Sequence, residues 1–324
     1  MKVTVGTFNL NNLFSRFNFD GAITELKKPG ATSAMTIRYE FTDQENYRIR
    51  TFMGKLVIAK KEADIETIAK RILAMNVDVL AVQEVEDIDI LKAFNSQYLG
   101  NLYPYRVLIE GNDPRFIDVG ILSKMPIGAG TSHQTAVHPQ AQTKPVFGRD
   151  LLEAEILNQN RTRKLFTLYN NHLKSHFGDD DNSGQGKTGN DTRRQQQAEM
   201  IRTIVSSRQN KNAKYVIVGD MNDPPDSAQL QAMLTIDGNP IVNALTNPAE
   251  TRPAKKETVG PGPQTTAWTY RHKASGQPPT HSLYDQIWLS PAIAPALQGA
   301  TIDRRTTHGG DGSDHDPAWI ELDL

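Results

Sequence analysis

The stretch Tyr215-Val-Ile-Val-Gly-Asp-Met-Asn222 joins a short β-prone run to two polar side chains that follow it directly. Its first four residues are typical of a buried strand, and Asp220 and Asn222 come where that strand ends. Binding groups gather at strand ends and loops, because a rigid scaffold positions them there. The stretch therefore predicts a strand that delivers a carboxylate and a carboxamide to a site.

Other strand-like runs repeat this plan along the chain. Polar side chains stand where the runs end or begin: Asn9 after 3–8, Glu84 after 77–82, His172 after 165–170, Asp285 at the beginning of 284–288, and His315 ahead of 318–322. We expect these widely separated residues to converge on one pocket that is rimmed by acids. Carboxylate and carboxamide oxygens without thiols suit a hard divalent cation, Mg²⁺ or Mn²⁺.

The composition limits the class of protein. The 324 residues carry a formal net charge of −1 and are 38% hydrophobic, which excludes a wholly disordered or fibrous chain. The absence of cysteine excludes disulfides, zinc–thiolate sites and cysteine nucleophiles. No apolar run approaches the ~20 residues of a membrane span. The N-terminus lacks the pattern of a secretory signal, so we expect a cytoplasmic protein, although a mature secreted form would have the same sequence features.

Helical periodicity is confined to a few segments. The predicted helices cover 63–75, 88–98 and 193–205. Short strands dominate the rest, so a two-layer or four-layer α/β arrangement fits better than a βαβ nucleotide-binding fold. No internal repeat or clear linker divides the chain. We expect one domain over residues 1–324, with loop insertions near 177–191 and 247–281.

Six short motifs, spread from residue 7 to residue 315, resemble in order those of the endonuclease/exonuclease/phosphatase superfamily, to which pancreatic deoxyribonuclease belongs. They are Thr7-Phe-Asn-Leu-Asn-Asn-Leu13, Val82-Gln-Glu84, Asn171-His-Leu-Lys174, Gly219-Asp-Met-Asn222, Asp285-Gln-Ile-Trp-Leu-Ser290 and Gly312-Ser-Asp-His315. Each motif alone occurs by chance, whereas the ordered set is specific. The resemblance implies a deoxyribonuclease I-like four-layer α/β sandwich, in which two packed, mostly antiparallel sheets are flanked by helices. It also implies metal-dependent cleavage of a phosphate ester.

The resemblance further implies roles for individual residues at the metal. Glu84 is expected to be the principal metal ligand, with Asn9 supporting the metal site and Asp314 as a second ligand. Asp220 and Asn222 are expected to orient the attacking water and to contact the scissile phosphate. The expected cofactor is Mg²⁺, with Mn²⁺ or Ca²⁺ as substitutes.

The remaining catalytic residues are the two histidines and Asp285. The resemblance implies that His315 acts as general base or stabilises phosphate charge, with Asp285 fixing its tautomer. His172 is expected to contact the leaving group or the phosphate. Lys174 and, by a looser match, Arg115 complete the expected phosphate contacts.

The motifs depart from two specialised branches of the superfamily. No tryptophan precedes Gly219, as it does in inositol-polyphosphate phosphatases, and Asn11 and His172 differ from the acid and asparagine of abasic-site enzymes. Two substrate classes remain. The chain is expected to be an endonuclease that cuts DNA or RNA with little sequence specificity, and the alternative is a sphingomyelinase-like phosphodiesterase of lipid head groups or small esters. A non-catalytic binding scaffold is a third interpretation.

Basic side chains favour nucleic acid as the partner. They cluster before the first helix and around the second-histidine region: Arg48, Arg50, Lys55, Lys60, Lys61, and Lys174, Lys187, Arg193, Arg194. Such side chains contact the phosphate backbone and give salt-dependent binding with little sequence preference. Ordinary solvated charge is the competing interpretation.

Overall fold

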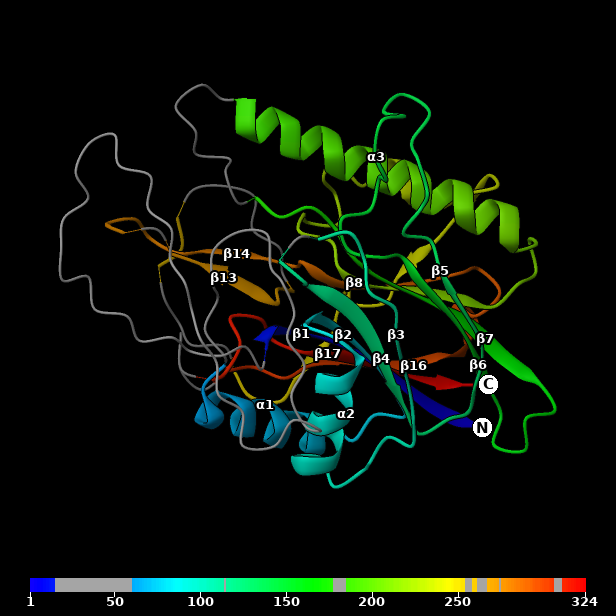
Figure 1. Ribbon diagram of the computed structural model, residues 1–324, viewed down its shortest axis with the longest axis vertical. Helices are drawn as coiled ribbons and strands as arrows, with labels where there is room; N and C mark the ends of the chain where they lie inside the picture. The colour runs from blue at the N-terminus through cyan, green and yellow to red at the C-terminus, as the bar shows by residue number, and fades with distance from the viewer. Residues whose placement is uncertain are drawn as a thin grey trace, which may run out of the picture.

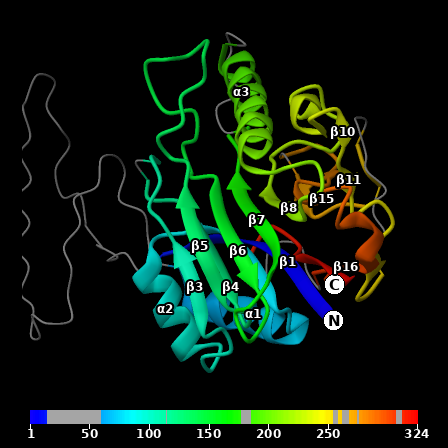
Figure 2. The same cartoon turned by 90° about the vertical axis from the view of Figure 1, so that its right-hand side faces the viewer.

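Two large β-sheets pack face to face, and helices cover their outer faces, so the described part of the chain forms four layers. The computed structural model describes residues 1–14, 60–113, 115–176, 185–253, 258–260, 267–273, 275–305 and 311–324. Helix α3 (Gln185–Arg208) runs along one side of the sandwich, and α1 (Glu62–Met75) and α2 (Ile88–Gln97) lie on the opposite side (Figures 1 and 2). The predicted four-layer α/β sandwich is confirmed.

Most strand pairs in both sheets are antiparallel. Among the described residues the larger sheet contains, in spatial order, β12 (Ala249–Glu250), β16 (Leu297–Ile302), β17 (Ala318–Asp323), β1 (Lys2–Leu13), β2 (Val79–Val85), β4 (Asp118–Ser123) and β3 (Tyr105–Leu108). The second sheet contains, over the same part of the chain, β11 (Val242–Asn243), β15 (Asp285–Leu289), β8 (Tyr215–Asp220), β7 (Lys164–His172), β6 (Leu152–Leu157) and β5 (Ile127–Ser132). Short hairpins pair β9 (Thr235–Ile236) with β10 (Asn239–Pro240), and β13 (Tyr270–His272) with β14 (Thr280–Ser282).

The buried apolar side chains of the described chain form three groups, one for each interface between layers. One group fills the space between the sheets and includes Val5 and Val218; a second packs α1 and α2 on the larger sheet, and a third packs α3 on the other. Burial of strands on both faces explains why runs such as 215–218 are continuously apolar. The sandwich therefore has a rigid interior behind the ends of its central strands.

Each sheet has a parallel pair at its centre, and the two pairs end at the same edge of the sandwich. These pairs are β1–β2 and β7–β8. Asn170 on β7 crosses between the sheets, because its Nδ2 donates to the Gly120 carbonyl at 2.8 Å and its Oδ1 accepts from Gln83 Nε2 at 2.8 Å. This buried polar contact fixes the relative placement of the sheets just behind the strand ends.

Two predicted strand ends are instead irregular points within longer strands. β1 continues past Asn9 to Leu13, and β2 continues through Glu84 to Val85. The pairing register shifts at both places, and Asn11, Asn12 and Glu84 have left-handed φ angles of 46°, 61° and 61°. The polar residues therefore mark bulges, which turn side chains out of the regular ladder without ending the strand.

The predicted loop over 177–191 is wrong in its second part. Residues 185–191 form the beginning of α3, whereas 177–184 lie outside the described residues. The beginning of this helix could not be predicted, because it contains Gly186 and Gly189 and has no apolar face. An i, i+4 ion pair of 2.8 Å between Lys187 and Asp191 lies there instead.

Other differences concern short or glycine-containing strands. β5 and β16 were not predicted, because Gly128, Gly130 and Gly299 interrupt their β-branched pattern. The predicted strand 284–288 corresponds to β15, and the predicted insertion 247–281 contains β12 and most of the β13–β14 hairpin. None of the described helices combines the length and the apolar character of a membrane span.

Candidate active site

Three strands of the six-stranded sheet place polar side chains next to one another. His172 on β7 pairs with Asp220 on β8, and Asp220 pairs with Asp285 on β15. Residues at one register level of a pleated sheet point to the same face, so these side chains form a row. Each is at most 2% exposed. The structure therefore brings together three residues that were predicted from separate strand ends.

His315 extends this row from the loop that precedes β17. Its Nδ1 lies 2.7 Å from Asp285 Oδ2, and its Nε2 lies 3.8 Å from Asp220 Oδ2. Burial disfavours the imidazolium, but the carboxylates of Asp285 and Asp220 outweigh that effect and hold the pKa of His315 well above its usual range. Asp285 lies where it can orient the His315 ring.

Asp220 is the centre of the polar contacts. Its Oδ2 accepts a 2.9 Å hydrogen bond from Asn9 Nδ2 and lies 3.5 Å from His172 Nε2. Its Oδ1 accepts a 2.9 Å hydrogen bond from the backbone N–H of Asn222. Burial raises the pKa of Asp220 to about 6, although the charge of His315 opposes the shift. A buried carboxylate that titrates this close to neutrality is typical of a functional site.

Glu84 reaches the same region from the bulge in β2. The bulge and the left-handed backbone turn its side chain away from the regular ladder. Burial and repulsion from Asp314 raise the pKa of Glu84, and a hydrogen bond from Asn9 opposes the shift. Asn9 therefore stands between the carboxylates of Glu84 and Asp220.

Asp314 lies at the exposed rim of the cluster. Its Oδ1 accepts a 2.7 Å hydrogen bond from Asn11 Nδ2, and the neighbouring Ser313 Oγ donates to the Asn9 carbonyl at 2.7 Å. These bonds hold the loop before β17 against the bulged end of β1. Asp314 is thus near enough for its charge to act on Glu84.

A second set of contacts holds the loop before β17 through Asp316. The carboxylate of Asp316, which is fully buried, lies 2.9 Å from Arg305 Nε, 3.4 Å from Arg71 Nη2 and 3.5 Å from Arg304 Nη1. Sequence analysis did not identify this cluster, because its members come from three separate segments with no shared motif. Its position next to His315 makes it a support for the site.

His172 and Asn222 face the cluster as neutral groups. Burial, helped by neighbouring cations, lowers the pKa of His172 well below its usual range, so its imidazole is uncharged. Its Nδ1 has no hydrogen-bond partner among the described residues. Asn222 has a left-handed φ of 52°, and its Nδ2 donates to the Leu173 carbonyl at 3.1 Å.

Arg149 is a buried cation that sequence analysis missed. Its Nε lies 3.1 Å from Asp113 Oδ2, and its Nη1 donates to the Leu173 carbonyl at 3.2 Å. Its charge acts on both Glu84 and Asp220. The available signal is a charged residue three positions before β6, which does not by itself indicate a site.

Arg115 and Lys174 are both partly exposed to solvent, whereas Arg149 is buried. The positive charges of Arg115 and Lys174 contribute to the lowered pKa of His172. Arg115 is bound to Asp113 through contacts of 3.0 and 2.8 Å, and about half of its side chain is exposed. Lys174 donates from Nζ to the Ser175 carbonyl at 3.0 Å. Both predicted phosphate contacts are therefore at the rim of the site.

Arg194, which was grouped with surface cations, is fully buried. Its Nε lies 2.6 Å from Asp223 Oδ2, and its Nη1 donates to the Lys174 carbonyl at 3.0 Å. It therefore connects the loops after β7 and β8 and is unavailable to a phosphate backbone. Arg193 is half-buried, and its guanidinium donates a hydrogen bond to the Pro145 carbonyl.

The basic cluster before α1 is described only at its end. Arg48, Arg50 and Lys55 lie outside the described residues. Lys60 is half-buried, donates from Nζ to the Asn11 carbonyl at 2.5 Å, and lies within electrostatic reach of Glu84. Lys60 thus adds a positive charge to the acidic end of the site.

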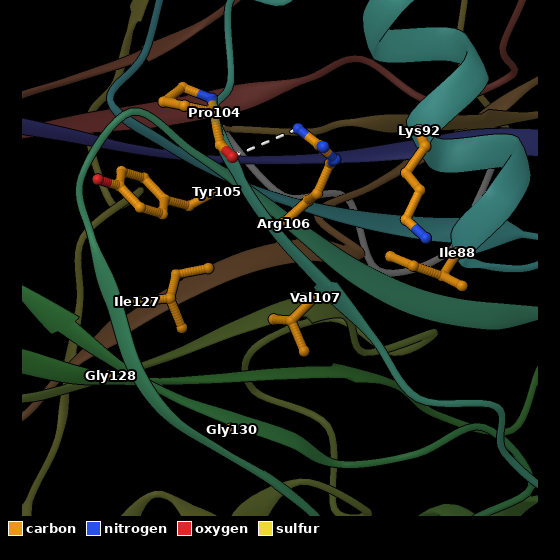
Figure 3. Close-up of a pocket in the computed structure, with 9 residues that line it drawn as sticks. All are labelled: Ile88, Lys92, Pro104, Tyr105, Arg106, Val107, Ile127, Gly128 and Gly130. Atoms are coloured by element: carbon orange, nitrogen blue, oxygen red, sulfur yellow. Dashed lines mark hydrogen bonds between the residues drawn. The ribbon is translucent and has the colours of Figure 1, made fainter.

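A hollow of about 420 Å³ lies elsewhere, between α2, β3 and β5 (Figure 3). Its lining includes Ile88, Tyr105, Arg106 and Val107. Tyr105 pairs with Ser123 at the end of β4 that is opposite to the active-site cluster. The hollow therefore contributes no residue to the candidate site.

The donor set at the site fits a divalent cation. Asp220, Asp285 and His315 present ligand atoms that all lie within 4.8 Å of one another, but His315 and Asp285 already contact each other at 2.7 Å. Glu84 and Asp314 provide two further carboxylates, whose charges repel each other. Asp285 Oδ1 is buried and has no hydrogen-bond partner among the described residues. Oxygen donors of this kind suit a hard ion, whose charge would relieve the repulsion between the acids.

Solved structures with the same fold include a protein bound to a DNA product and a phosphatase. The chain is similar to Danio rerio TDP2 in complex with single-strand DNA product (13% identity, TM-score 0.57, covering 100% of this chain and 99% of that one). It is also similar to the human Nocturnin catalytic domain with bound sulfate (14%, 0.57, 99% and 94%) and to a mannosyl-6-phosphatase of Bacteroides thetaiotaomicron (14%, 0.56, 99% and 100%). At these identities the likeness shows the fold.

No protein among those with curated functions matches the sequence. The family model described as "Endonuclease/Exonuclease/phosphatase family" matches residues 6–315, which is nearly the whole chain. That range includes the strand ends and loops that build the cluster around Asp220. The chain therefore belongs to the endonuclease/exonuclease/phosphatase family.

Proposed function

We propose that this protein is a divalent-metal-dependent endonuclease that hydrolyses phosphodiester bonds in DNA or RNA with little sequence specificity. Membership of the family supports a metal-dependent phosphoesterase. The observation that carries the proposal is the buried Asp285–His315 pair, which lies beside Asp220 while Glu84 approaches from the other sheet. Of the metals, Mg²⁺ is proposed, with Mn²⁺ or Ca²⁺ as substitutes.

Different residues of the chain serve different roles in hydrolysis of the phosphate ester. Hydrolysis of a phosphodiester requires neutralised charge, an activated water and help for the leaving oxygen. Glu84, with Asn9 and Asp314, would hold a divalent ion, and the ion would supply Lewis acidity when bound. Asp220 and Asn222 orient the water and the phosphate.

The two imidazoles differ in charge and therefore in role. His315 is held as an imidazolium by Asp285, so its Nε2–H can stabilise the anionic phosphate or donate a proton to an oxygen atom. The role of general base toward the water requires that His315 first lose this proton. His172 is neutral, so it can donate or accept a hydrogen bond near the leaving oxygen without adding charge. Arg149 supplies a permanent charge from within the protein.

Nucleic acid is proposed as the substrate because cations surround an otherwise acidic cluster. Arg115, Lys174 and Lys60 stand at its edge, where successive phosphates of one strand would pass. Among the similar folds, TDP2 is complexed with single-strand DNA product. The mannosyl-6-phosphatase makes a sugar phosphate the second candidate substrate.

A panel of substrates tests the proposal. Supercoiled plasmid, single-stranded RNA, sphingomyelin and mannose 6-phosphate are incubated with Mg²⁺, with and without EDTA. We expect EDTA-sensitive nicking of plasmid or cleavage of RNA that falls steadily with salt. Activity confined to sphingomyelin or to the sugar phosphate would overturn the nuclease proposal, and inactivity with every substrate and with Mg²⁺, Mn²⁺ or Ca²⁺ would favour a binding scaffold.

Variants connect the activity to the site. His315→Ala and Asp220→Ala are each expected to lower turnover by several orders of magnitude while circular dichroism is retained. Asp226→Ala is the matched control, because Asp226 is exposed on the segment that follows Asn222. Near-normal activity of either site variant would contradict the assignment.

A further inference from the structure

A row of four aromatic rings starts at His315 and leads away from the catalytic cluster. The ring centroids of His315 and Tyr270 are 4.8 Å apart, those of Tyr270 and Tyr284 are 5.0 Å apart, and those of Tyr284 and His176 are 5.8 Å apart. The last two pairs are nearly parallel, with interplanar angles of 16° and 23°. Rings at these separations are offset, so part of each ring remains uncovered by its neighbour.

Besides His315, the rings come from three segments, each of which is bound to the backbone of a site residue or its neighbour. Tyr270 lies on the β13–β14 hairpin, which projects from one end of the sandwich (Figure 1) and forms a backbone bridge to His315. Tyr284 directly precedes Asp285, and its carbonyl accepts from the backbone N–H of Met221 at 2.8 Å. His176 follows β7, and its Nε2 lies 2.6 Å from the Asn222 carbonyl. The rings are thus held in place by the same backbone that positions the reacting groups.

The chemistry of the row suits a flat, uncharged ligand. Tyr270 and Tyr284 are half-buried, and about a third of the His176 side chain is exposed. Tyrosine has an ordinary pKa of about 10, so both phenols are uncharged near neutral pH. Neutral aromatic faces bind nucleobases by stacking, whatever their sequence.

We propose that the row formed by Tyr270, Tyr284 and His176 is a specificity determinant that holds an aromatic ring, such as a nucleobase, beside the phosphate that is hydrolysed. The inference rests on the proposed function and narrows it, because it selects substrates with a base next to the scissile bond. Packing of the row against His315 places the bound ring directly next to the reacting phosphate. A pyranose has no flat π face to stack on these rings. A choline head group binds aromatic rings by cation–π attraction, and the sphingomyelin arm of the substrate panel distinguishes that ligand from a nucleobase.

The test compares two oligonucleotides of equal length and identical backbone. One carries ordinary bases, and the other carries tetrahydrofuran baseless residues throughout. Because stacking contributes about 1–3 kcal/mol per base, the wild-type protein is expected to show kcat/KM roughly 10-fold or more higher for the base-bearing oligomer. The difference is expected chiefly in KM, since the ring contributes binding and no reacting atom.

Variants show which residues cause the preference for the base-bearing oligomer. Tyr284→Leu is expected to remove most of this preference, and Tyr284→Phe, which keeps the ring, is expected to retain the preference. His176→Leu is a second probe at a more exposed position, for use if Tyr284→Leu does not fold. Tyr105→Leu is the matched control, because Tyr105 lies at the opposite end of the β4 strand from the site.

The outcomes separate this inference from the proposed function. Equal hydrolysis of both oligomers by the wild-type protein, or a full preference in Tyr284→Leu and His176→Leu, overturns the aromatic determinant and leaves the nuclease. Hydrolysis of mannose 6-phosphate with neither oligomer cut overturns both. A preference that falls in both leucine variants and persists in Tyr284→Phe and Tyr105→Leu supports the inference.

Discussion

The amide of Asn9 donates a 2.9 Å hydrogen bond to Asp220 and thereby joins two strands of opposite sheets that are 211 residues apart. The same amide favours the charged form of Glu84 by hydrogen bonding. An asparagine between two buried acids supplies a donor without adding a third negative charge. The contact therefore sets both the spacing of the sheets and the electrostatics at their shared end.

Replacement of Asn9 by leucine tests this relationship. Asn9→Leu leaves a buried carboxylate of Asp220 without this donor, which should cost about 1–3 kcal/mol in the free energy of unfolding. Turnover is expected to fall about 10- to 100-fold, as for groups that orient metal ligands. Urea unfolding and steady-state kinetics measure the two effects. Asn239→Leu, at an exposed position, is the control, and equal behaviour of the two variants would refute the proposed link.

Asp285→Asn should lower the pKa of His315. The elevated pKa depends on the Asp285 carboxylate, and the folded state now holds the imidazole proton more tightly than the unfolded state. The contribution of His315 to stability is therefore complete below about pH 6.5 and is lost as the pH rises through its folded value. The variant loses this contribution. Titration of the ring protons by NMR measures the pKa, with Asp226→Asn as control; an unchanged pKa would show that Asp285 does not set the charge.

Glu84→Gln should weaken the binding of Mg²⁺ to the protein. Burial and the nearby Asp314 carboxylate raise the pKa of Glu84, so a cation that neutralises this repulsion should stabilise the fold. We expect Mg²⁺ to increase the melting temperature of the wild-type protein and to have a much smaller effect on the variant. Glu321→Gln, at an exposed position of β17, serves as the control. An identical Mg²⁺ response in both variants would place the ion elsewhere.

Asp118→Asn should alter the dependence of stability on pH. Burial raises the pKa of Asp118 to about 7, and its Oδ2 has no hydrogen-bond partner among the described residues. Its contribution to stability is complete below about pH 4 and is lost as the pH rises through about 7. The variant stays neutral, so its free energy of unfolding should fall by less than that of the wild-type protein over this range. The difference between the two proteins is at most about 4 kcal/mol.

Urea unfolding of both proteins at several pH values measures the Asp118 effect. Asp226→Asn again provides an exposed acid as control. Parallel stability curves for the wild-type protein and Asp118→Asn would show that Asp118 does not titrate in this range.

Strand ends could be predicted from the sequence because alternating or apolar runs stop at polar residues there. This signal located Asp220, Asp285 and His172, which the structure places at one level of one sheet. The same signal located Glu84. It did not predict the bulge that turns the Glu84 side chain, because a single residue with a left-handed backbone does not change the hydrophobic periodicity of the sequence. Nothing in the local pattern identified Arg149, since its significance depends on burial against residues distant in the chain.

The same limit explains the errors in secondary structure. β5 lies at a sheet edge, where Gly128 and Gly130 replace the residues that usually mark a strand. The first turns of α3 depend on the Lys187–Asp191 pair rather than on an apolar face. For β5 the pairing with β6 decides the conformation, whereas for α3 a local charge pair takes the place of the apolar pattern that would predict a helix.

The shared register of β7, β8 and β15 makes catalysis a sensitive reporter of correct folding. A slip of β15 by a single position against β8 would bring Gln286 opposite Asp220 and send Asp285 to the far face of the sheet. Such a misfolded chain would still bury many apolar side chains and still appear compact in bulk measurements. It would be inert toward phosphate esters, so the fraction of active molecules measures how many have β7, β8 and β15 aligned in the correct register.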